Sequence, residues 1–395
     1  GEAVRKFCSA LLAAVVVAVA GCSAQPGGDP FPSATLSPAP SVESVTASPS
    51  PSPTPSPTPT TPHIVGTVVM RSFGDMLIHS DVYPQARTAE GGYDFNHMLD
   101  GVRPYLQNAD ITTANMEVPV ASADFGFSGY PSFNCPPQVI DALKTAGVDI
   151  VNNGTNHSMD RLAAGVKSST ANIAAAGMPY AGSFASAEDK ASPRIIERNG
   201  VKVGFLSYTY GTNGIPVPAD QPYLVNLIDL DVIQAEVKEL KPQVDMVIVI
   251  MHAGEEYEFF PNDYQRSIVN AAMAAGATFV LGGHPHVVQP MERTPGGGGV
   301  WYSHGNFLSG QLDTANRVGG IGEFTFHKMS DGNVVLGKMR FMPTYTTNPY
   351  QGKPYGVVPL PEAGQLGLVD AADWKRQLVE RMGSMSDVEV VDYLD

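Results

Sequence analysis

From Thr67 onward, short apolar runs alternate with amphipathic segments. The apolar runs predict buried strands at residues 67–73, 110–115, 148–151, 244–251 and 277–281. The amphipathic segments predict helices at residues 95–107, 137–146, 162–176, 232–240, 264–275 and 371–381. Strands and helices in such alternation are typical of an α/β fold.

Other stretches indicate antiparallel pairing. The dipeptide Asn199-Gly200 separates two alternating segments and predicts a hairpin over residues 194–209. A further, more antiparallel sheet is predicted by the segments at residues 300–303, 322–328 and 334–341. After residue 381 the chain is acidic, and we expect a loose tail there.

The last predicted strand of the α/β region ends in two glycines and two histidines. In an extended segment, residues two apart point to the same side, so His284 and His286 can both reach one metal ion or two adjacent ions. Pro285 between them stiffens the backbone. The alternative is a pair of loop histidines that cap the strand without binding metal.

Metal-capable side chains recur just past the predicted strand ends. Ligands of open α/β sheets bind at the carboxyl ends of the strands, because the loops converge there. Five strands each deliver such a side chain, which favours one metal site over unrelated structural residues. The residues concerned are Asp75, Glu117, Asn156, His157, His252, His284 and His286.

These residue types define the expected chemistry. Carboxylate, amide and imidazole ligands together suit manganese, iron or zinc, and we expect one or two such ions. Two divalent ions about 3.5–4 Å apart polarise a phosphoryl oxygen and lower the pKa of a bridging water. The histidines at positions 63, 97 and 327 lack this setting, so we expect them in solvated or core positions.

The chain is acidic, with a formal charge of -15 and a sequence pI near 4.9. This balance argues against a nucleic acid as partner. An anionic substrate therefore needs local cations. Metal ions supply them, with Arg161 and Arg266 as further candidates.

The first residues are typical of an export signal. A short cationic region precedes an apolar run over 7–20 that is too short to be a comfortable membrane span. The tetrapeptide ending at Cys22 resembles a bacterial lipobox. It predicts a signal peptide over 1–21 and a lipid on Cys22 that anchors an extracytoplasmic protein to the outer face of the cell membrane. The alternative is ordinary secretion with cleavage nearby.

Residues 22–62 are expected to form a stalk. Their last part repeats Pro with Ser and Thr, which favours polyproline II and cannot bury a core. The folded part is expected to begin near His63. It contains a single cysteine, Cys135, so we expect no intramolecular disulfide.

Six motifs follow one another in the folded part: Gly74-Asp75, Asn115-Met116-Glu117, 156–160, 252–257, 283–290 and 303–307. From about residue 66 to residue 310 they resemble the bacterial capsule-synthesis protein CapA (PgsA) family. That family is related to the calcineurin-like metallophosphoesterases and is associated with poly-γ-glutamate capsule production or export. The resemblance implies a layered αββα sandwich of the metallo-dependent phosphatase type over 63–347, with 348–395 as a C-terminal extension containing one helix.

The resemblance also implies a set of metal ligands. They are Asp75 and His286 for the first ion, Asn156, His252 and His284 for the second, and Glu117 at the usual position of a bridging aspartate. One departure stands out. Calcineurin-like enzymes carry a histidine two residues after the first aspartate, and here that residue is Leu77.

Other roles follow from the same resemblance. His157 corresponds to a general acid that protonates the leaving oxygen, and Asp160 is expected to orient it. Glu256 is expected to hold His252, to contact substrate or to make a structural hydrogen bond. His304 and Asn306 fall in a motif that shapes the substrate pocket, although the first of these positions is expected to be apolar.

Two functions remain open from the sequence. The first is a metal-dependent hydrolase that acts on a phosphoester or related bond during synthesis or export of poly-γ-glutamate or another envelope polymer. The second is a non-catalytic protein that binds the polymer or assists its membrane-bound synthase. A binding protein of a transporter is disfavoured, because the sequence shows no internal repeat.

Overall fold

The computed structural model describes residues 50, 52 and 54–395, which fall into two units, Gly1–Pro59 and Thr60–Asp395. The predicted signal peptide, Cys22 and most of the predicted stalk lie outside the described residues. The described residues of the first unit are exposed and carry no helix or strand. In the part of the chain that is described, no helix is both long and apolar enough to span a bilayer.

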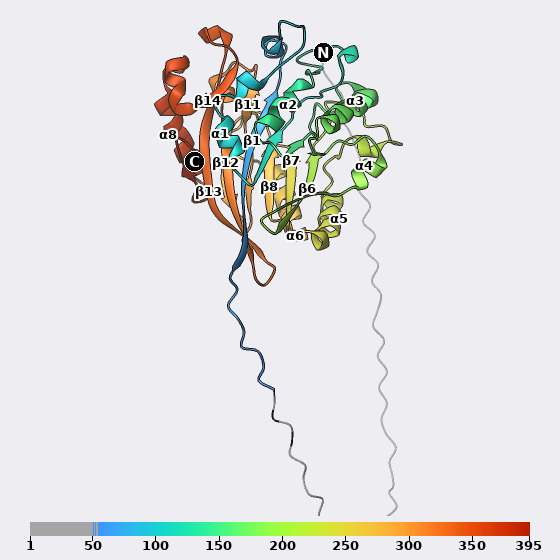
Figure 1. Cartoon of the computed structure of the whole chain (residues 1–395), viewed down its shortest axis with the longest axis vertical. Coiled ribbons are helices and arrows are strands. Elements are labelled where there is room, and N and C mark those ends of the chain that lie inside the picture. The colour runs from blue at the N-terminus through green and yellow to red at the C-terminus, as the bar shows by residue number, and fades with distance from the viewer. Residues whose placement is uncertain (1–49, 51, 53) are drawn as a thin grey trace, which may run out of the picture. The chain divides into compact units, whose positions relative to one another are not determined.

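The first sheet has nine strands and is built around β1 (Ile64–Leu77) (Figure 1). On one side, β2 (Ile111–Asn115), β3 (Ile150–Asn152) and β4 (Tyr180–Ala181) follow in parallel. On the other side, β12 (Val318–Met329), β13 (Val334–Thr347) and β14 (Gly356–Pro359) are antiparallel. Two short strands, β11 (Asn306–Ser309) and β15 (Glu389–Val390), pair with β1 and β13.

The second sheet has six strands in the order β5-β6-β7-β8-β10-β9. Its bounds are β5 (Arg194–Arg198), β6 (Val201–Thr209), β7 (Met246–His252), β8 (Phe279–Gly283), β9 (Met291–Arg293) and β10 (Gly299–Trp301). The predicted hairpin is confirmed, because β5 and β6 are antiparallel neighbours. Asn199 and Gly200 between them both have positive φ, as the favoured two-residue turn requires.

Eight α-helices are described: α1 (Arg103–Gln107), α2 (Gln138–Thr145), α3 (Leu162–Ala175), α4 (Ala187–Ala191), α5 (Leu230–Leu240), α6 (Asp263–Ala275), α7 (Thr314–Arg317) and α8 (Ala371–Met382). The prediction of one helix over 95–107 was wrong. A 3-10 turn (Asn96–Leu99) and α1 share this stretch, with Gly101 between them. A Cβ on Gly101 would lie 2.5 Å from the Val357 carbonyl oxygen of β14, so contact with the sheet breaks the helix here.

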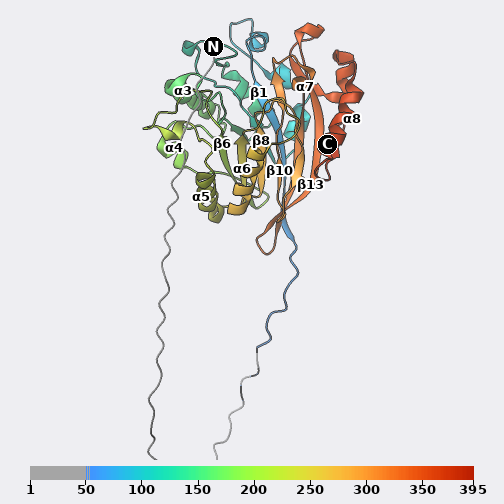
Figure 2. The same cartoon turned by 180° about the vertical axis from the view of Figure 1, so that it is seen from behind.

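The two sheets face each other across one core. Val68 and Ile111 of the first sheet pack with Ile248 and Phe279 of the second, together with Trp301. A second cluster joins the outer face of the first sheet to α1, α2 and α3, and a third joins the outer face of the second sheet to α5 and α6. Figure 2, which shows the molecule from behind, shows α6 lying over the second sheet. The predicted αββα sandwich is thereby confirmed.

The region after β10 differs from the prediction in two ways. The strands β12 and β13 form no separate sheet: β12 runs along β1 from Ile64 to Phe73, because its apolar face is needed to close the core between the sheets. The acidic tail is not loose either. Val390 lies in β15, and Leu394 is buried, because apolar residues in this tail pack against the core.

Candidate metal site and catalytic cleft

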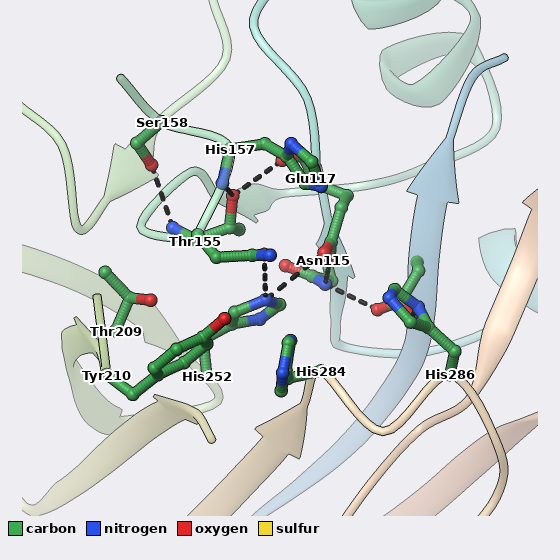
Figure 3. A network of polar contacts seen from close by, with 12 residues as sticks. Asn115, Glu117, Thr155, His157, Ser158, Thr209, Tyr210, His252, His284 and His286 are labelled. Atoms are coloured by element: carbon green, nitrogen blue, oxygen red, sulfur yellow. Dashed lines mark hydrogen bonds and ion pairs between the residues drawn. The ribbon is translucent and has the colours of Figure 1, made fainter. Parts of the chain in front are cut away.

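The carboxyl ends of strands from both sheets meet at one place. Asp75 lies near the end of β1, His252 ends β7, and Glu117 follows β2 by two residues. The loop after β8 adds His284 and His286, and all five side chains are buried. Figure 3 shows residues of this set, with Asn115, converging on one space. Side chains from distant parts of the sequence are thus brought together, as the strand-end pattern predicts.

The loop after β8 is not extended, contrary to the prediction. His284 has φ 102° and His286 has φ 60°, so both lie in the left-handed region. Hydrogen bonds hold this conformation: Tyr257 N donates to Pro285 O at 2.8 Å, and Asn316 Nδ2 donates to His286 O at 3.0 Å. Such backbone strain is typical of functional sites. The two rings still lie near each other, with centroids 5.9 Å apart.

Asn115 connects the two carboxylates of the site. Its Nδ2 donates to Asp75 Oδ1 at 2.6 Å and to Glu117 Oε2 at 2.7 Å. Its Oδ1 accepts a 2.7 Å hydrogen bond from Asn152 Nδ2, which fixes the orientation of the amide. One amide therefore holds two buried acids side by side. The sequence places Asn115 in a motif but assigns it no role.

His286 is paired with Asp75. Its Nδ1 lies 2.9 Å from Asp75 Oδ2 and 2.9 Å from Asn306 Oδ1. Burial alone lowers the pKa of His286, but the hydrogen bond to Asp75 and its charge outweigh burial and raise the pKa to about 9. Asn306 thus contacts a predicted metal ligand, and it is 1% exposed.

In contrast to His286, the side chains of Glu117 and His252 favour their neutral forms. Burial, and then the charge of Asp75, raises the pKa of Glu117 to about 8. Burial lowers the pKa of His252 to about 3. These two groups lie 3.2 Å apart, and a cation bound there would favour the carboxylate and the neutral imidazole, which are the forms that bind metal.

The residues present fit a divalent metal ion. Glu117, His284 and His286 each offer a ligand atom, and these atoms lie within 4.8 Å of one another. Within the described chain, Glu117 Oε1, His252 Nδ1 and His284 Nδ1 are buried without a hydrogen-bond partner. Buried lone pairs without a partner are costly, and a bound cation would satisfy those that face it.

The predicted general acid, His157, and its partner, Asp160, lie beside the candidate metal ligands. His157 Nδ1 is 2.8 Å from Asp160 Oδ2, and both residues line a cleft of about 780 Å³. The neighbouring Asn156 turns its Oδ1 toward His252 Nε2 at 2.9 Å. The edge of His157 packs against Phe133, with ring centroids 4.7 Å apart. The cleft wall thus carries both a histidine–aspartate pair and an amide that contacts a metal-site imidazole.

Asn213 was not predicted from the sequence. Its Oδ1 accepts a 3.1 Å hydrogen bond from Asn156 Nδ2, and its Nδ2 lies 3.5 Å from His157 Nδ1. It has φ 53° and precedes Gly214 in the segment after β6. The Asn-Gly pair signals a turn, but only the tertiary structure brings that turn to the cleft.

Other predicted residues have different surroundings. Glu256 lines the cleft, and its Oε1 is 3.7 Å from Nε2 of His284 rather than near His252. His304 lies beneath the site, with Nε2 2.8 Å from Ser72 Oγ and its ring against Trp301.

The two arginines proposed to meet substrate charge do not line the cleft. Arg161 donates to the Phe125 carbonyl oxygen, and Arg266 faces Glu292. The cleft is lined by Leu77, His79, Tyr130, Pro131, Ser132, Phe133, Asn156, His157, Asp160, Asn213, Ile215, Glu256, Tyr257, His286 and Gln311. No lysine or arginine is among these described lining residues.

Residues 70–311 match the family described as Bacterial capsule synthesis protein PGA_cap. The chain belongs to this family. The predicted resemblance is thereby confirmed, and the six motifs lie within the matched range. The β14, β15 and α8 elements of the PGA_cap chain lie beyond it.

Proteins similar to this chain have names that are consistent with this family. The chain is 28% identical over 280 residues to the capsule biosynthesis protein CapA of Bacillus anthracis, which covers 68% of this chain and 66% of that protein, just under two thirds. It is 28% identical over 272 residues to the PGA biosynthesis protein CapA of Bacillus subtilis (strain 168), covering 67% and 70%. Among solved structures, the NAD nucleotidase NadN of Haemophilus influenzae is similar, with 12% identity, a TM-score of 0.45, and 84% and 58% coverage.

Proposed function

We propose that this PGA_cap protein is a metal-dependent hydrolase that cleaves a phosphoester or a related bond in a capsule or other envelope polymer. One observation carries the proposal. The His157–Asp160 pair lines the same cleft as His286, and His286 belongs to a buried set of carboxylate and imidazole groups, three atoms of which have no hydrogen-bond partner in the described chain. A proton donor beside a cation site is what hydrolysis of an ester requires.

A divalent ion held by Glu117, His284 and His286 would supply Lewis acidity toward a phosphoryl oxygen and lower the pKa of a bound water. Asp75 holds His286 through Nδ1 and thereby orients its ring. Asn115 keeps Asp75 and Glu117 side by side although both are acids.

The protein side chains move the proton. Asp160 accepts a hydrogen bond from His157 Nδ1, which orients the ring and leaves Nε2 free to protonate a leaving oxygen. Asn213 accepts a hydrogen bond from Asn156 and lies beside His157, so it helps to position both side chains at the cleft. Since the cleft lining includes no lysine or arginine in the described chain, substrate charge must be met by metal and histidine.

The biological setting is part of the proposal. The relatives are named for capsule and PGA biosynthesis, so we propose poly-γ-glutamate or a similar polymer as the setting. We further propose that Cys22 carries a lipid anchor, that the stalk holds the domain at the outer face of the membrane, and that the membrane-bound synthase is its partner. A Cys22→Ala variant tests the anchor, since it is expected to block lipid attachment, and globomycin is expected to block cleavage of the signal peptide before Cys22.

Hydrolysis is tested with the purified chain and bis-p-nitrophenyl phosphate or p-nitrophenyl phosphate, with manganese, iron or zinc added. We expect turnover that a chelator abolishes. The His157→Asn variant is expected to lose about 10²–10⁴-fold in kcat while keeping its metal content. Absence of turnover with all three metals would refute the hydrolase proposal for phosphoesters.

A second candidate is a non-catalytic protein that binds the polymer or assists its synthase. It is favoured by Leu77, an apolar residue in the cleft lining at the position where calcineurin-like enzymes carry a ligand histidine. This candidate predicts that His157→Asn leaves capsule production in cells unchanged. The hydrolase proposal predicts that the same variant abolishes it.

A further inference from the structure

A second cavity lies on the outer face of the second sheet, between β6 and α5. Its volume is about 270 Å³, and it shares no lining residue with the metal-site cleft. It is lined by Lys190, Tyr208, Val217, Pro218, Ala219, Pro222, Val225, Asn226, Leu227, Val232 and Glu236. The walls are therefore mostly aliphatic, with four polar side chains among them.

Three of these polar groups have a buried atom without a well-formed hydrogen bond in the described chain: Tyr208 Oη, Asn226 Oδ1 and Glu236 Oε1. Tyr208 and Glu236 are neighbours, and each shifts the pKa of the other as a weak hydrogen-bond partner. Tyr208 is 1% exposed and Asn226 is 6% exposed, so neither side chain is simply solvated at the surface. Buried polar atoms gathered around one cavity are unusual, because each destabilises the fold unless a partner is bound.

The orientation of Asn226 is fixed. Its Nδ2 donates a 3.0 Å hydrogen bond to the Ser207 carbonyl oxygen, so Oδ1 is the free atom of the amide. The carboxylate of Glu236 and this amide oxygen can only accept hydrogen bonds. The Tyr208 hydroxyl can donate or accept. The missing partner must therefore bring at least two donor hydrogens on a small head group.

The charge of Glu236 favours a positively charged head group over a neutral one. Burial raises the pKa of Glu236, while the charge of Lys190 and the Tyr208 hydroxyl oppose this shift, so a further positive charge would stabilise the carboxylate. A neutral hydroxyl offers a single donor hydrogen and no charge. An ammonium group offers three donors and forms charge-assisted hydrogen bonds, which are roughly twice as strong as neutral ones.

We propose that this cavity is a binding site for a small molecule with a primary ammonium head on an aliphatic body. The head group would bind Glu236, Asn226 and Tyr208, and the body would pack against the aliphatic wall. The proposal does not depend on the metal site or on hydrolysis, because no residue of the cavity belongs to either.

The test is an NMR titration of the full chain that follows the side-chain amide signal of Asn226. Three probes share one aliphatic body: isobutylamine as its ammonium salt, isobutanol and isovalerate. We expect a saturable shift with the ammonium, weaker binding of the alcohol, and no binding of the carboxylate. Glu236→Gln should weaken ammonium binding by about tenfold or more. Asp231→Asn, at an exposed position near the start of the same helix, should leave it unchanged.

Circular dichroism melting checks that each variant is folded before titration. Three results would overturn the proposal: no saturable shift with isobutylammonium, equal affinity for the alcohol or the carboxylate, or unchanged binding in the folded Glu236→Gln variant. Each would mean that the three polar groups are satisfied by water or that the cavity recognises no charge.

Discussion

Arg381 donates a 3.0 Å hydrogen bond to the carbonyl oxygen of Val288. This contact joins α8 to the loop that carries the two metal-site histidines. The guanidinium also lies over the ring of Phe259, 3.9 Å from its centroid, and burial lowers the pKa of Arg381 to about 10. Since α8 lies outside the range matched by the PGA_cap family, a residue beyond the family's region supports its central motif.

We therefore expect Arg381→Met to destabilise the chain by about 1.5–3 kcal/mol, because the buried Val288 carbonyl loses a charged donor. Urea unfolding measures the change, and metal affinity should fall with it. Arg376→Ala, an exposed arginine on the same helix, is the matched control and should change stability by less than about 0.5 kcal/mol. Equal effects of the two variants would show that the contact with Val288 does not stabilise the fold.

Replacing Asn115 should separate the roles of amide and metal. Asn115→Leu removes the donor shared by Asp75 and Glu117, so two buried acids lose their common hydrogen-bond partner. Without metal we expect a loss of about 3 kcal/mol in the free energy of unfolding. Added manganese should recover more stability in this variant than in the wild type, because the cation can take the place of the lost donor.

Thermal denaturation with a chelator and with manganese measures both values. Asn333→Ala, in the exposed turn between β12 and β13, serves as the control. If manganese stabilises the Asn115→Leu variant no more than the wild type, the ion does not sit near these carboxylates.

Loss of a ligand should reduce metal binding. We expect His284→Ala to weaken metal affinity at least about tenfold, since even residues that only orient a ligand commonly contribute that much. His97→Ala removes an exposed histidine and should leave affinity unchanged. Elemental analysis of the purified variants gives the metal content, and retention of full metal content by His284→Ala would contradict the assigned ligand set.

The Leu77 position offers a gain-of-function test. Leu77 lines the cleft and stands two residues after Asp75, so an imidazole there would face the site. We expect Leu77→His to raise the metal-to-protein ratio and any hydrolytic activity. Leu77→Met, which keeps an apolar side chain of similar size, should change neither. An unchanged ratio in a folded Leu77→His variant would show that the site binds its full set of ions without this ligand.

Much of the fold could be predicted because its signals are local. The Asn199-Gly200 turn requires positive φ at both residues, and those two residue types adopt it readily. The continuous apolar run before His252 indicates a strand covered on both faces, and β7 is buried throughout. These runs also place the ends of the strands, which is why the sequence alone predicts that the candidate metal ligands meet at one edge of the sheets.

The failures arose where distant contacts overrode local pattern. The helix expected over 95–107 is interrupted because β14 approaches Gly101. The acidic tail was expected to be loose, but Leu394 is buried against the core. Neither neighbour is visible from the sequence around these positions.

The alternation of strands and helices, the family, and the metal-capable residues at strand ends could all be predicted from the sequence. They depend on hydrophobic periodicity and on residue type, which are properties of short segments. The contacts among these side chains required the folded structure: Asn115 bridges two acids, Asn213 lies beside His157, and Glu256 faces His284. Such contacts join residues from separate elements, and their geometry is set by the packing of the two sheets rather than by any local pattern.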